Sequence, residues 1–219
     1  MDTTKDTVIV FSGGLDSTTL LYEERDRVAL ALTFDYGSNH SSLETACARI
    51  HCERLGVEHI VIPLDFIRNY FRSSLLDGAD AVPEGGYDDT NMHSTVVPFR
   101  NGIMLAIACG MAESRGLQRV LIANHGGDHS VYPDCRPEFV KAIDSAAQAG
   151  TYIRVRVDAP YTFMAKSDIV KRGAQLGIDY SETYSCYRGG PKHCGRCATC
   201  VERREAFRLA GLADPTEYD

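Results

Sequence analysis

The chain has 219 residues, 44% of them hydrophobic, and a formal net charge of -7 at pH 7. This size and apolar content predict a well-buried core and exclude an intrinsically disordered protein. Because nucleic-acid-binding surfaces are usually basic, the acidic balance argues against a direct nucleic-acid partner. Residues 1–6 are too polar for a signal peptide, and no uninterrupted apolar run approaches the roughly 18 residues of a membrane span, so we expect a cytoplasmic protein with no membrane partner.

The first predicted strand, Val8 to Phe11, leads directly into the turn Ser-Gly-Gly-Leu-Asp-Ser at 12–17, and a helix follows. Glycines adopt backbone angles closed to other residues, and turn amides together with a helix N-terminus attract anions such as phosphate. Neither the Walker pattern nor the dinucleotide-binding glycine pattern occurs in the chain. The turn resembles the PP-loop of the ATP pyrophosphatases, in which it holds ATP phosphates while the enzyme adenylates a carboxylate, an amide or a related oxygen.

Later segments alternate between apolar strands and helices. Ser41 and Glu44 have the spacing of a capping box that opens a helix through Leu55, and a second helix is expected from about Asn101 to Arg115. Further strands are predicted at 28–34, 59–62, 119–123 and 152–157. This alternation predicts an α/β fold with a Rossmann-like parallel sheet that is buried on both faces.

A parallel sheet of this kind binds ligands beyond the carboxyl ends of its strands. We therefore expect the active site in the loops that follow the strands. The loop from Asp65 to Pro98 is unusually long, and a loop of that length is typical of a lid or a disordered segment. The five loops are 12–17, 35–40, 65–98, 124–136 and 158–166.

Four of the eight cysteines lie close together near the C-terminus, with spacings of seven, two and two residues. Two-residue gaps let thiolates converge on one ion, and four thiolates close a tetrahedral shell that leaves no open position for catalysis. The pattern predicts a structural zinc site; an iron–sulfur cluster or redox thiols remain as alternatives. Cys47, Cys52 and Cys109 fall in helical patterns and are expected to be small core residues. The predicted ligands are Cys186, Cys194, Cys197 and Cys200.

Several short motifs accompany the turn and the cysteine set. They are Val131 to Phe139, which contains Tyr-Pro-Asp-Cys-Arg, Phe34 to Gly37, Val97 to Asn101, and Ser185 to Tyr187. With these motifs the chain resembles the 7-cyano-7-deazaguanine synthase family along nearly its full length. The resemblance implies a PP-loop domain of the adenine-nucleotide alpha hydrolase type over residues 1–180. It also implies a zinc-binding segment over 181–219, whose C-terminal helix packs on the same domain, and a homodimer.

The activity implied by the resemblance is an ATP-driven conversion of 7-carboxy-7-deazaguanine and ammonia to 7-cyano-7-deazaguanine. Adenylated carboxylate and amide are the intermediates, and Mg²⁺ accompanies the ATP. Adenylation makes chemical sense because a carboxylate is a poor electrophile, whereas an acyl adenylate offers AMP as a leaving group.

The resemblance also implies roles by position. Asp16, Arg100 and Lys166 are the expected catalytic residues. The expected ATP-binding residues are Ser12, Gly13, Gly14, Leu15, Asp16, Ser17, Thr33, Phe34, Tyr36 and Arg100. The expected substrate-binding residues are His125, Asp128, Tyr132, Asp134 and Arg136, in which an aspartate would accept hydrogen bonds from the guanine-like edge and an aromatic ring would stack on the base.

Two loops depart from the commonest pattern of this family. Ser38-Asn39-His40 replaces a Gln-Arg-His-like stretch, and His125 to Asp128 replaces a Cys-Glu-Thr-Asp-like run, so a cation and a carboxylate are missing. These departures leave an alternative open, in which the enzyme stops at the amide or joins the adenylated carboxylate to another amine, such as the N-terminus of a protein substrate. A tRNA-modifying PP-loop ligase is disfavoured by the acidic charge, and a zinc-stabilised nucleotide-binding module without turnover is the alternative outside enzymes.

Overall fold

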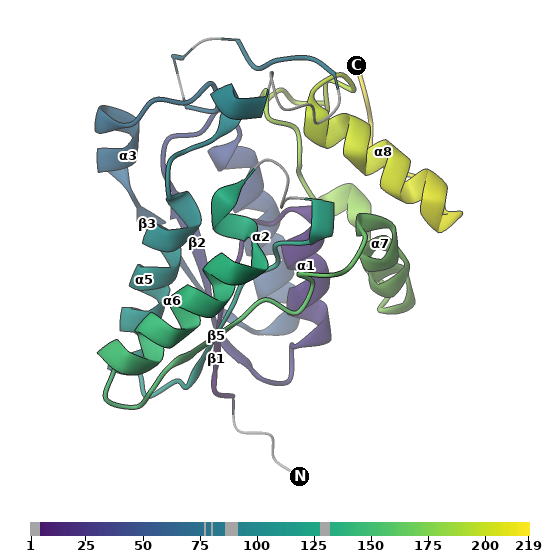
Figure 1. Cartoon of the computed structure of the whole chain (residues 1–219). Coiled ribbons are helices and arrows are strands. Elements are labelled where there is room, and N and C mark those ends of the chain that lie inside the picture. The colour runs from purple at the N-terminus through teal and green to yellow at the C-terminus, as the bar shows by residue number, and fades with distance from the viewer. Residues whose placement is uncertain (1–4, 77, 80, 86–91, 128–131) are drawn as a thin grey trace.

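The computed structural model describes residues 5–76, 78–79, 81–85, 92–127 and 132–219. Within these residues, five parallel strands form one sheet in the order β3-β2-β1-β4-β5 (Figure 1). The predicted α/β fold with a parallel sheet is therefore confirmed. The strands are β1 (Thr7–Val10), β2 (Val28–Asp35), β3 (Glu58–Pro63), β4 (Arg119–Leu121) and β5 (Arg156–Asp158).

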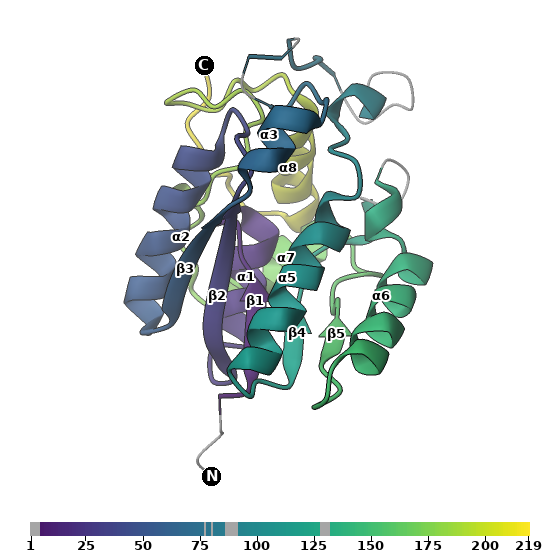
Figure 2. The same cartoon turned by 90° about the vertical axis from the view of Figure 1, so that its left-hand side faces the viewer.

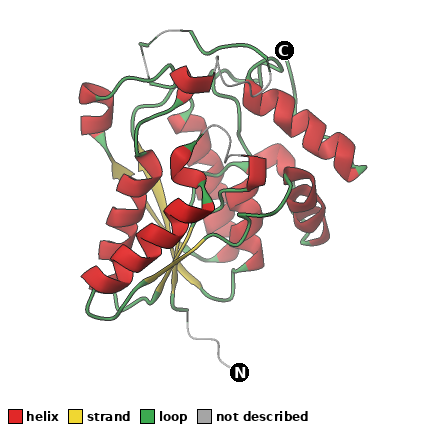
Figure 3. Ribbon diagram, in the orientation of Figure 1, coloured by secondary structure: helices red, strands yellow, loops and turns green. Residues whose placement is uncertain are grey.

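Helices cover both faces of this sheet, as Figures 2 and 3 show. Helices α5 and α6 pack on one face, α1, α2 and α7 pack on the other, and α8 lies against α7. The helices are α1 (Leu15–Glu23), α2 (Ser41–Leu55), α3 (Asp65–Tyr70), α5 (Arg100–Ser114), α6 (Pro137–Gly150), α7 (Lys166–Gln175) and α8 (Ala198–Ala210). Short 3-10 turns lie at His93–Thr95, Pro133–Cys135 and Tyr180–Glu182.

Successive residues of the strands are buried in different clusters. Val8 and Leu30 pack with side chains of α5, whereas Ile9 and Ala31 pack with side chains of α1 and α7. All four are completely buried. Because neighbouring side chains of a strand point to opposite faces, these strands need apolar residues at every position, which explains their nearly continuous hydrophobic sequence.

The strand order places a topological switch at the middle of the sheet. After β1 the chain builds β2 and β3 on one side, and it then returns to build β4 and β5 on the other side. Loops that leave the carboxyl ends of β1 and β4 therefore diverge, and a crevice at such a point is where open α/β sheets bind ligands. The turn at 12–17 follows β1 at this point.

Two expectations from the sequence were wrong in detail. The last strand begins at Arg156, because Tyr152 is fully exposed and Arg154 has a φ of 56°, so residues 152–154 form the turn after α6. The loop from 65 to 98 begins as helix α3, and its Leu75 and Leu76 are buried in the main core.

Among the described residues, one stretch, His93–Ser114, has the length and mean hydropathy, 1.4, that a membrane span requires. Half of the stretch is buried inside the protein. Its helix α5 packs against β1, β4 and α6, so its apolar composition matches that of a core helix.

Candidate active site

The turn at 12–17 is held in shape by its own hydroxyl groups. The Gly14 amide donates to the Ser12 hydroxyl at 3.2 Å, and the two serine oxygens, of Ser12 and Ser17, lie 3.1 Å apart. Gly13 has a φ of 81°, and a Cβ atom there would lie 2.4 Å from the carbonyl oxygen of Glu44. A glycine is therefore required for α2 to approach the turn. No side chain caps α1 at Gly14, which keeps the first amides of the helix available to an anion.

A cavity opens from this turn at the switch point of the sheet, and side chains from β2, α2, α5, α7 and the segment before α8 complete its walls. Eleven of the residues expected to bind ATP or substrate, or to act in catalysis, line this one cavity. They are Ser12, Gly14, Leu15, Asp16, Ser17, Thr33, Phe34, Tyr36, Arg100, Tyr132 and Lys166.

Lys166 lies between two carboxylates in the cavity region. Its Nζ atom is 3.2 Å from Oδ2 of Asp16 and 2.7 Å from Oε2 of Glu202, and all three side chains are largely buried. The other carboxylate oxygen of Asp16 is buried and accepts no hydrogen bond from the part of the chain that the structure describes. An unpaired buried carboxylate oxygen is suited to a cation or a donor on a ligand. Glu202 was missed at the sequence level because α8 carries no motif for this contact.

Arg100 is held at the start of α5 by Tyr36. Its guanidinium donates to the Tyr36 hydroxyl at 3.1 Å, and its central carbon lies 5.5 Å from the ring centroid. Burial lowers the pKa of Arg100, but the nearby Tyr36 hydroxyl and the Asp134 carboxylate raise it above its ordinary value. Arg100 therefore supplies a permanent positive charge to the cavity, and its forked donors match a phosphate or a carboxylate.

Glu44 and His40 also line the cavity and were not among the predicted site residues. The capping box predicted for Glu44 was wrong, because His40 is the N-cap and no side chain caps α2. Burial raises the pKa of Glu44 to about 8, although the charge of Arg100 opposes this rise. Burial, assisted by Arg100, lowers the pKa of His40 to about 4. Both groups are thus largely uncharged at neutral pH.

Of the residues expected to bind the base, Tyr132 lines the cavity and Asp134 does not. Tyr132 lines the cavity, and its hydroxyl lies 3.1 Å from Oγ1 of Thr95 and 3.0 Å from the hydroxyl of Tyr187. The Asp134 carboxylate instead accepts a hydrogen bond from the backbone amide of Asn101 at 2.8 Å, in the first turn of α5. This contact is typical of a helix cap, so Asp134 positions the motif on α5.

Two further residues expected to bind the base, His125 and Arg136, do not line the described cavity. His125 is buried, accepts a hydrogen bond from the Gly127 amide on Nδ1, and has its Nε2 atom 3.7 Å from Glu202. Arg136 is half-buried at the N-cap of α6. Asp128 lies outside the described residues.

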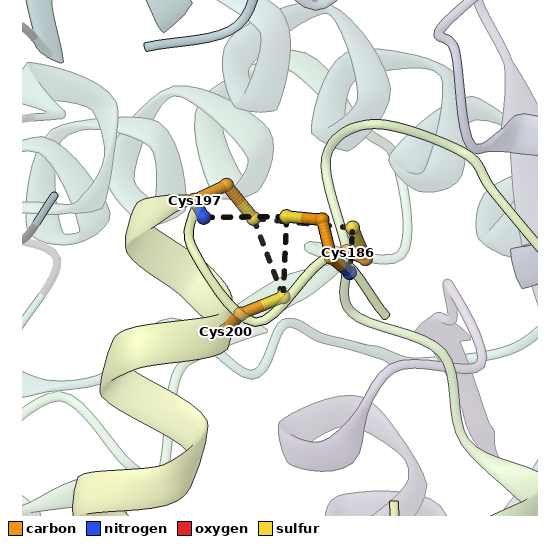
Figure 4. Close-up of side chains that lie close together, drawn as sticks. Cys186, Cys197 and Cys200 are labelled. Atoms are coloured by element: carbon orange, nitrogen blue, oxygen red, sulfur yellow. Dashed lines mark hydrogen bonds between the residues drawn. The ribbon is translucent and has the colours of Figure 1, made fainter. Parts of the chain in front are cut away.

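The four C-terminal cysteines converge in a buried cluster, shown in part in Figure 4. Their sulfur atoms all lie within 4.8 Å of one another, and the backbone amide of Cys194 donates to Cys186 while that of Cys197 donates to Cys194. Gly195 has a φ of 67°, which allows the tight turn between these ligands. Four convergent thiols with amide donors fit a tetrahedral metal ion, as the spacing predicted.

The segment that carries these cysteines also forms one wall of the cavity. The Thr199 hydroxyl donates to the carbonyl of Ser185 at 2.6 Å, which joins the start of α8 to the strand-like segment before it. Both residues are adjacent to cysteines of the cluster. The cavity residues that the sequence did not reveal here are Tyr184, Ser185, Tyr187 and Thr199.

The first departure from the family pattern lies outside the cavity. Ser38 pairs with Leu76 in an isolated bridge, and the Asn39 side-chain amide donates to the carbonyl of Ser74 at 3.3 Å. Neither residue lines the described cavity, whereas the adjacent His40 does. Asn39 therefore contacts the 73–76 segment and not the described cavity.

Comparison with known proteins identifies close relatives over the whole chain. A family model described as "Queuosine biosynthesis protein QueC" matches residues 6–211. The 7-cyano-7-deazaguanine synthase of Porphyromonas gingivalis is 60% identical over 219 residues, which is 100% of both chains. The 7-cyano-7-deazaguanine synthase of Desulfotalea psychrophila is 48% identical over 215 residues, covering 97% of this chain and 98% of that protein.

A solved structure is similar in fold. The NMN synthetase from Francisella tularensis matches with a TM-score of 0.55 and 13% sequence identity, covering 96% of this chain and 79% of that one. At this sequence identity the similarity shows a shared architecture alone and carries no information about the reaction.

Proposed function

The chain belongs to the QueC family of queuosine biosynthesis proteins, and on that premise we propose that it is an ATP-dependent ligase that makes 7-cyano-7-deazaguanine. Its substrates are 7-carboxy-7-deazaguanine and ammonia, and adenylated carboxylate and amide are the intermediates. The observation that carries this proposal is the joining of the PP-loop, Arg100 and Lys166 around one cavity at the switch point of the sheet.

In this proposal the PP-loop and the amides at the start of α1 bind the triphosphate. Gly13 supports this role because its lack of a side chain brings α2 close to the turn. Lys166, held by Asp16 and Glu202, supplies positive charge beside the loop. Such charge stabilises the negative charge that develops as pyrophosphate leaves. Thr33, Phe34 and Tyr36, at the carboxyl end of β2, contact the nucleoside.

Arg100 orients an anionic group of a substrate for reaction with ATP. Its charge is permanent, and the Tyr36 hydroxyl fixes its plane at the cavity wall. A carboxylate and a phosphate both accept two hydrogen bonds from such a guanidinium. Tyr132 contributes an aromatic surface for the deazaguanine ring, whereas Asp134 supports this role by holding its motif against α5.

Two metal ions belong to the proposal, and each rests on residues of this chain. Cys186, Cys194, Cys197 and Cys200 hold a structural zinc ion, which fixes the segment that forms one cavity wall. Asp16, with a buried carboxylate oxygen that lacks a donor in the described structure, is suited to hold Mg²⁺ that accompanies ATP. Magnesium supplies charge neutralisation on the phosphates.

The assembly and location of the protein are proposed on family grounds. Membership of a small-molecule biosynthetic family supports a cytoplasmic homodimer that has no direct nucleic-acid partner. The net charge of -7 is consistent with that last point.

Mass spectrometry of the reaction products tests the proposed function. The purified protein is incubated with 7-carboxy-7-deazaguanine, ATP, magnesium and ammonium, and each substrate is omitted in turn. The proposal predicts a nitrile that forms only when all are present. An amide as the final product, or no ATP-dependent product, would contradict it.

A further inference from the structure

The proposed reaction needs a proton acceptor in the cavity, because one nitrogen atom loses three protons on the way from ammonia to nitrile. The first proton leaves when ammonia attacks the acyl adenylate. The other two leave as the amide is adenylated and then loses AMP. Among the residues assigned above, Arg100 and Lys166 are already charged. Asp16 is paired with Lys166, and Asp134 accepts a hydrogen bond from the Asn101 amide outside the cavity.

We propose that Glu44 is the general base that receives the protons of the nitrogen nucleophile. This assignment rests on the proposed function and adds a catalytic residue to it. Glu44 lies in the first turn of α2, and its side chain lines the cavity together with the PP-loop and Arg100. A methyl group on Gly14 would lie 4.0 Å from Oε1 of Glu44 and 3.2 Å from the Ser12 hydroxyl, so the carboxylate faces the space beside the loop.

The position of Glu44 is set by tertiary packing. The backbone of α2 approaches the PP-loop so closely that a Cβ atom on Gly13 would meet the carbonyl oxygen of Glu44 at 2.4 Å. Within the described parts of the chain, no hydrogen bond to the side-chain oxygens of Glu44 is found. The Nε2 atom of His40 lies 3.7 Å from Oε2 of Glu44. The carboxylate thus keeps its lone pairs available for a ligand.

The electrostatic surroundings suit a base that works near neutral pH. Burial raises the pKa of Glu44 to about 8, and Arg100 of α5 is the charged group that lowers it. His40 is kept neutral by a pKa of about 4, and the facing PP-loop contributes the uncharged Gly13 and Gly14. A catalytic base is most effective when its pKa lies near the working pH, and ordinary glutamate is too weak a base for this task.

Each of the three proton losses accompanies one bond change. On the acyl adenylate, nitrogen forms the C–N bond, the C–O bond to AMP breaks with its electron pair on AMP, and Glu44 takes one N–H proton. On the amide, oxygen attacks the α-phosphorus of a second ATP, pyrophosphate leaves, and Glu44 takes a second proton. Loss of the third proton then forms the C≡N bond as AMP departs. Glu44 releases each proton to solvent through the open cavity before the next step.

The test separates adenylation from nitrogen transfer in Glu44→Gln. Carboxylate-dependent exchange of pyrophosphate into ATP reports the first adenylation, which needs no base, and nitrile formation reports the full sequence. We expect exchange within about threefold of the wild type and nitrile formation reduced by about 100-fold or more. Glu44→Asp, which keeps a carboxylate, should restore part of the nitrile rate. Glu53→Gln, on the exposed part of the same helix, is the matched control and should match the wild type in both assays.

The pH profile gives a second readout. At constant free ammonia, nitrile formation by the wild type should rise with pH and level off near the pKa of Glu44, about 8, whereas Glu44→Gln should lack this rise. A Glu44→Gln protein with the nitrile rate of the wild type would overturn the assignment. An equal loss of exchange and nitrile formation would overturn it too, because Glu44 would then act in ATP binding. A wild-type protein that forms no ATP-dependent product would contradict the proposed function itself. The exchange assay on the wild type separates this outcome from a failure of the Glu44 assignment.

Discussion

The ammonium group of Lys166 lies 2.7 Å from a carboxylate oxygen of Glu202, two residues after the metal-site cysteine Cys200. The same ammonium group lies 3.2 Å from Asp16 of the PP-loop. Helix α8 therefore connects the cysteine cluster to the PP-loop through two ion pairs that share Lys166. The metal site and the cavity are parts of one structure, so changes in one should be measurable in the other.

Glu202→Gln tests this connection. We expect kcat/KM for ATP to fall roughly 10- to 100-fold, because Lys166 loses the closer of its two carboxylates and its position beside the PP-loop. Zinc content should stay unchanged. Glu205→Gln on the exposed side of α8, where Glu205 pairs with Arg208, is the control. Steady-state kinetics equal to those of the wild type would contradict a positioning role for Glu202.

Cys197→Ser tests the coupling in the other direction. Removing one of four thiols should abolish stoichiometric zinc and lower the melting temperature, because metal binding at such sites contributes to folding. The KM for ATP should rise as well, since Thr199 and Ser185 line the cavity. Cys109→Ala, a buried cysteine outside the set, should keep its zinc. Metal analysis of a stable, zinc-free wild-type protein would refute the structural role of the ion.

Asp16→Ala tests the phosphate end of the cavity. The change removes both the partner of Lys166 and the buried oxygen suited to Mg²⁺. We expect AMP formation to fall on the order of 100-fold or more, with zinc content unchanged. Asp168→Ala, an exposed aspartate on α7, is the matched control. AMP production by Asp16→Ala at the wild-type rate would show that the residue has no part in adenylation.

Glu44→Gln is expected to stabilise the protein in a pH-dependent manner. The pKa of Glu44 is about 8 in the folded protein, against an ordinary 4.5, so the folded state binds this proton more tightly than the unfolded chain. The contribution of protonated Glu44 to stability is therefore fully present below about pH 4.5 and is lost as the pH rises through about 8. Glutamine does not titrate. The free energy of unfolding of Glu44→Gln relative to the wild type should therefore rise over this pH range, by on the order of 1–3 kcal/mol. Melting temperatures at about pH 5 and pH 8.5 measure it; a constant difference would contradict the raised pKa.

Asp134→Ala should lower stability by about 1 kcal/mol, the usual effect of losing a helix-capping side chain. The lost contact is the hydrogen bond from the Asn101 amide to the Asp134 carboxylate. Asp134→Asn keeps an acceptor oxygen and should behave nearly as the wild type in urea unfolding. A large loss of substrate affinity in Asp134→Asn at unchanged stability would restore the base-binding role expected from the sequence.

Much of the fold follows from local sequence patterns. The nearly continuous apolar strands require burial on both faces. The residues at 12–17 hold the shape of their turn through hydrogen bonds within the turn itself. The arrangement of the four cysteines is also determined locally, because backbone amides within the segment donate hydrogen bonds to the sulfur atoms. Such short-range features can be predicted from the sequence without knowledge of the tertiary structure.

Residues that depend on packing between distant segments were missed or misassigned. Glu44 has the spacing of a capping residue, and only the approach of α2 to Gly13 turns it into a cavity residue. Glu202 gains its role from the packing of α8 against α7, which brings it to Lys166. The contact of Asp134 with the first turn of α5 likewise depends on where α5 packs. No local sequence pattern predicts these three contacts.

The ratio of AMP to nitrile at complete conversion of 7-carboxy-7-deazaguanine distinguishes nitrile synthesis by two adenylations from its alternatives. Chromatography coupled to mass spectrometry, with a ¹⁵N-labelled ammonium salt as substrate, counts both products and identifies the nitrogen source. We expect two AMP molecules for each nitrile, because the carboxylate and the amide oxygen are each adenylated once. We also expect the ¹⁵N label in the nitrile group. One AMP with a labelled amide as the end product, or an unlabelled conjugate with another amine, would contradict the proposed function.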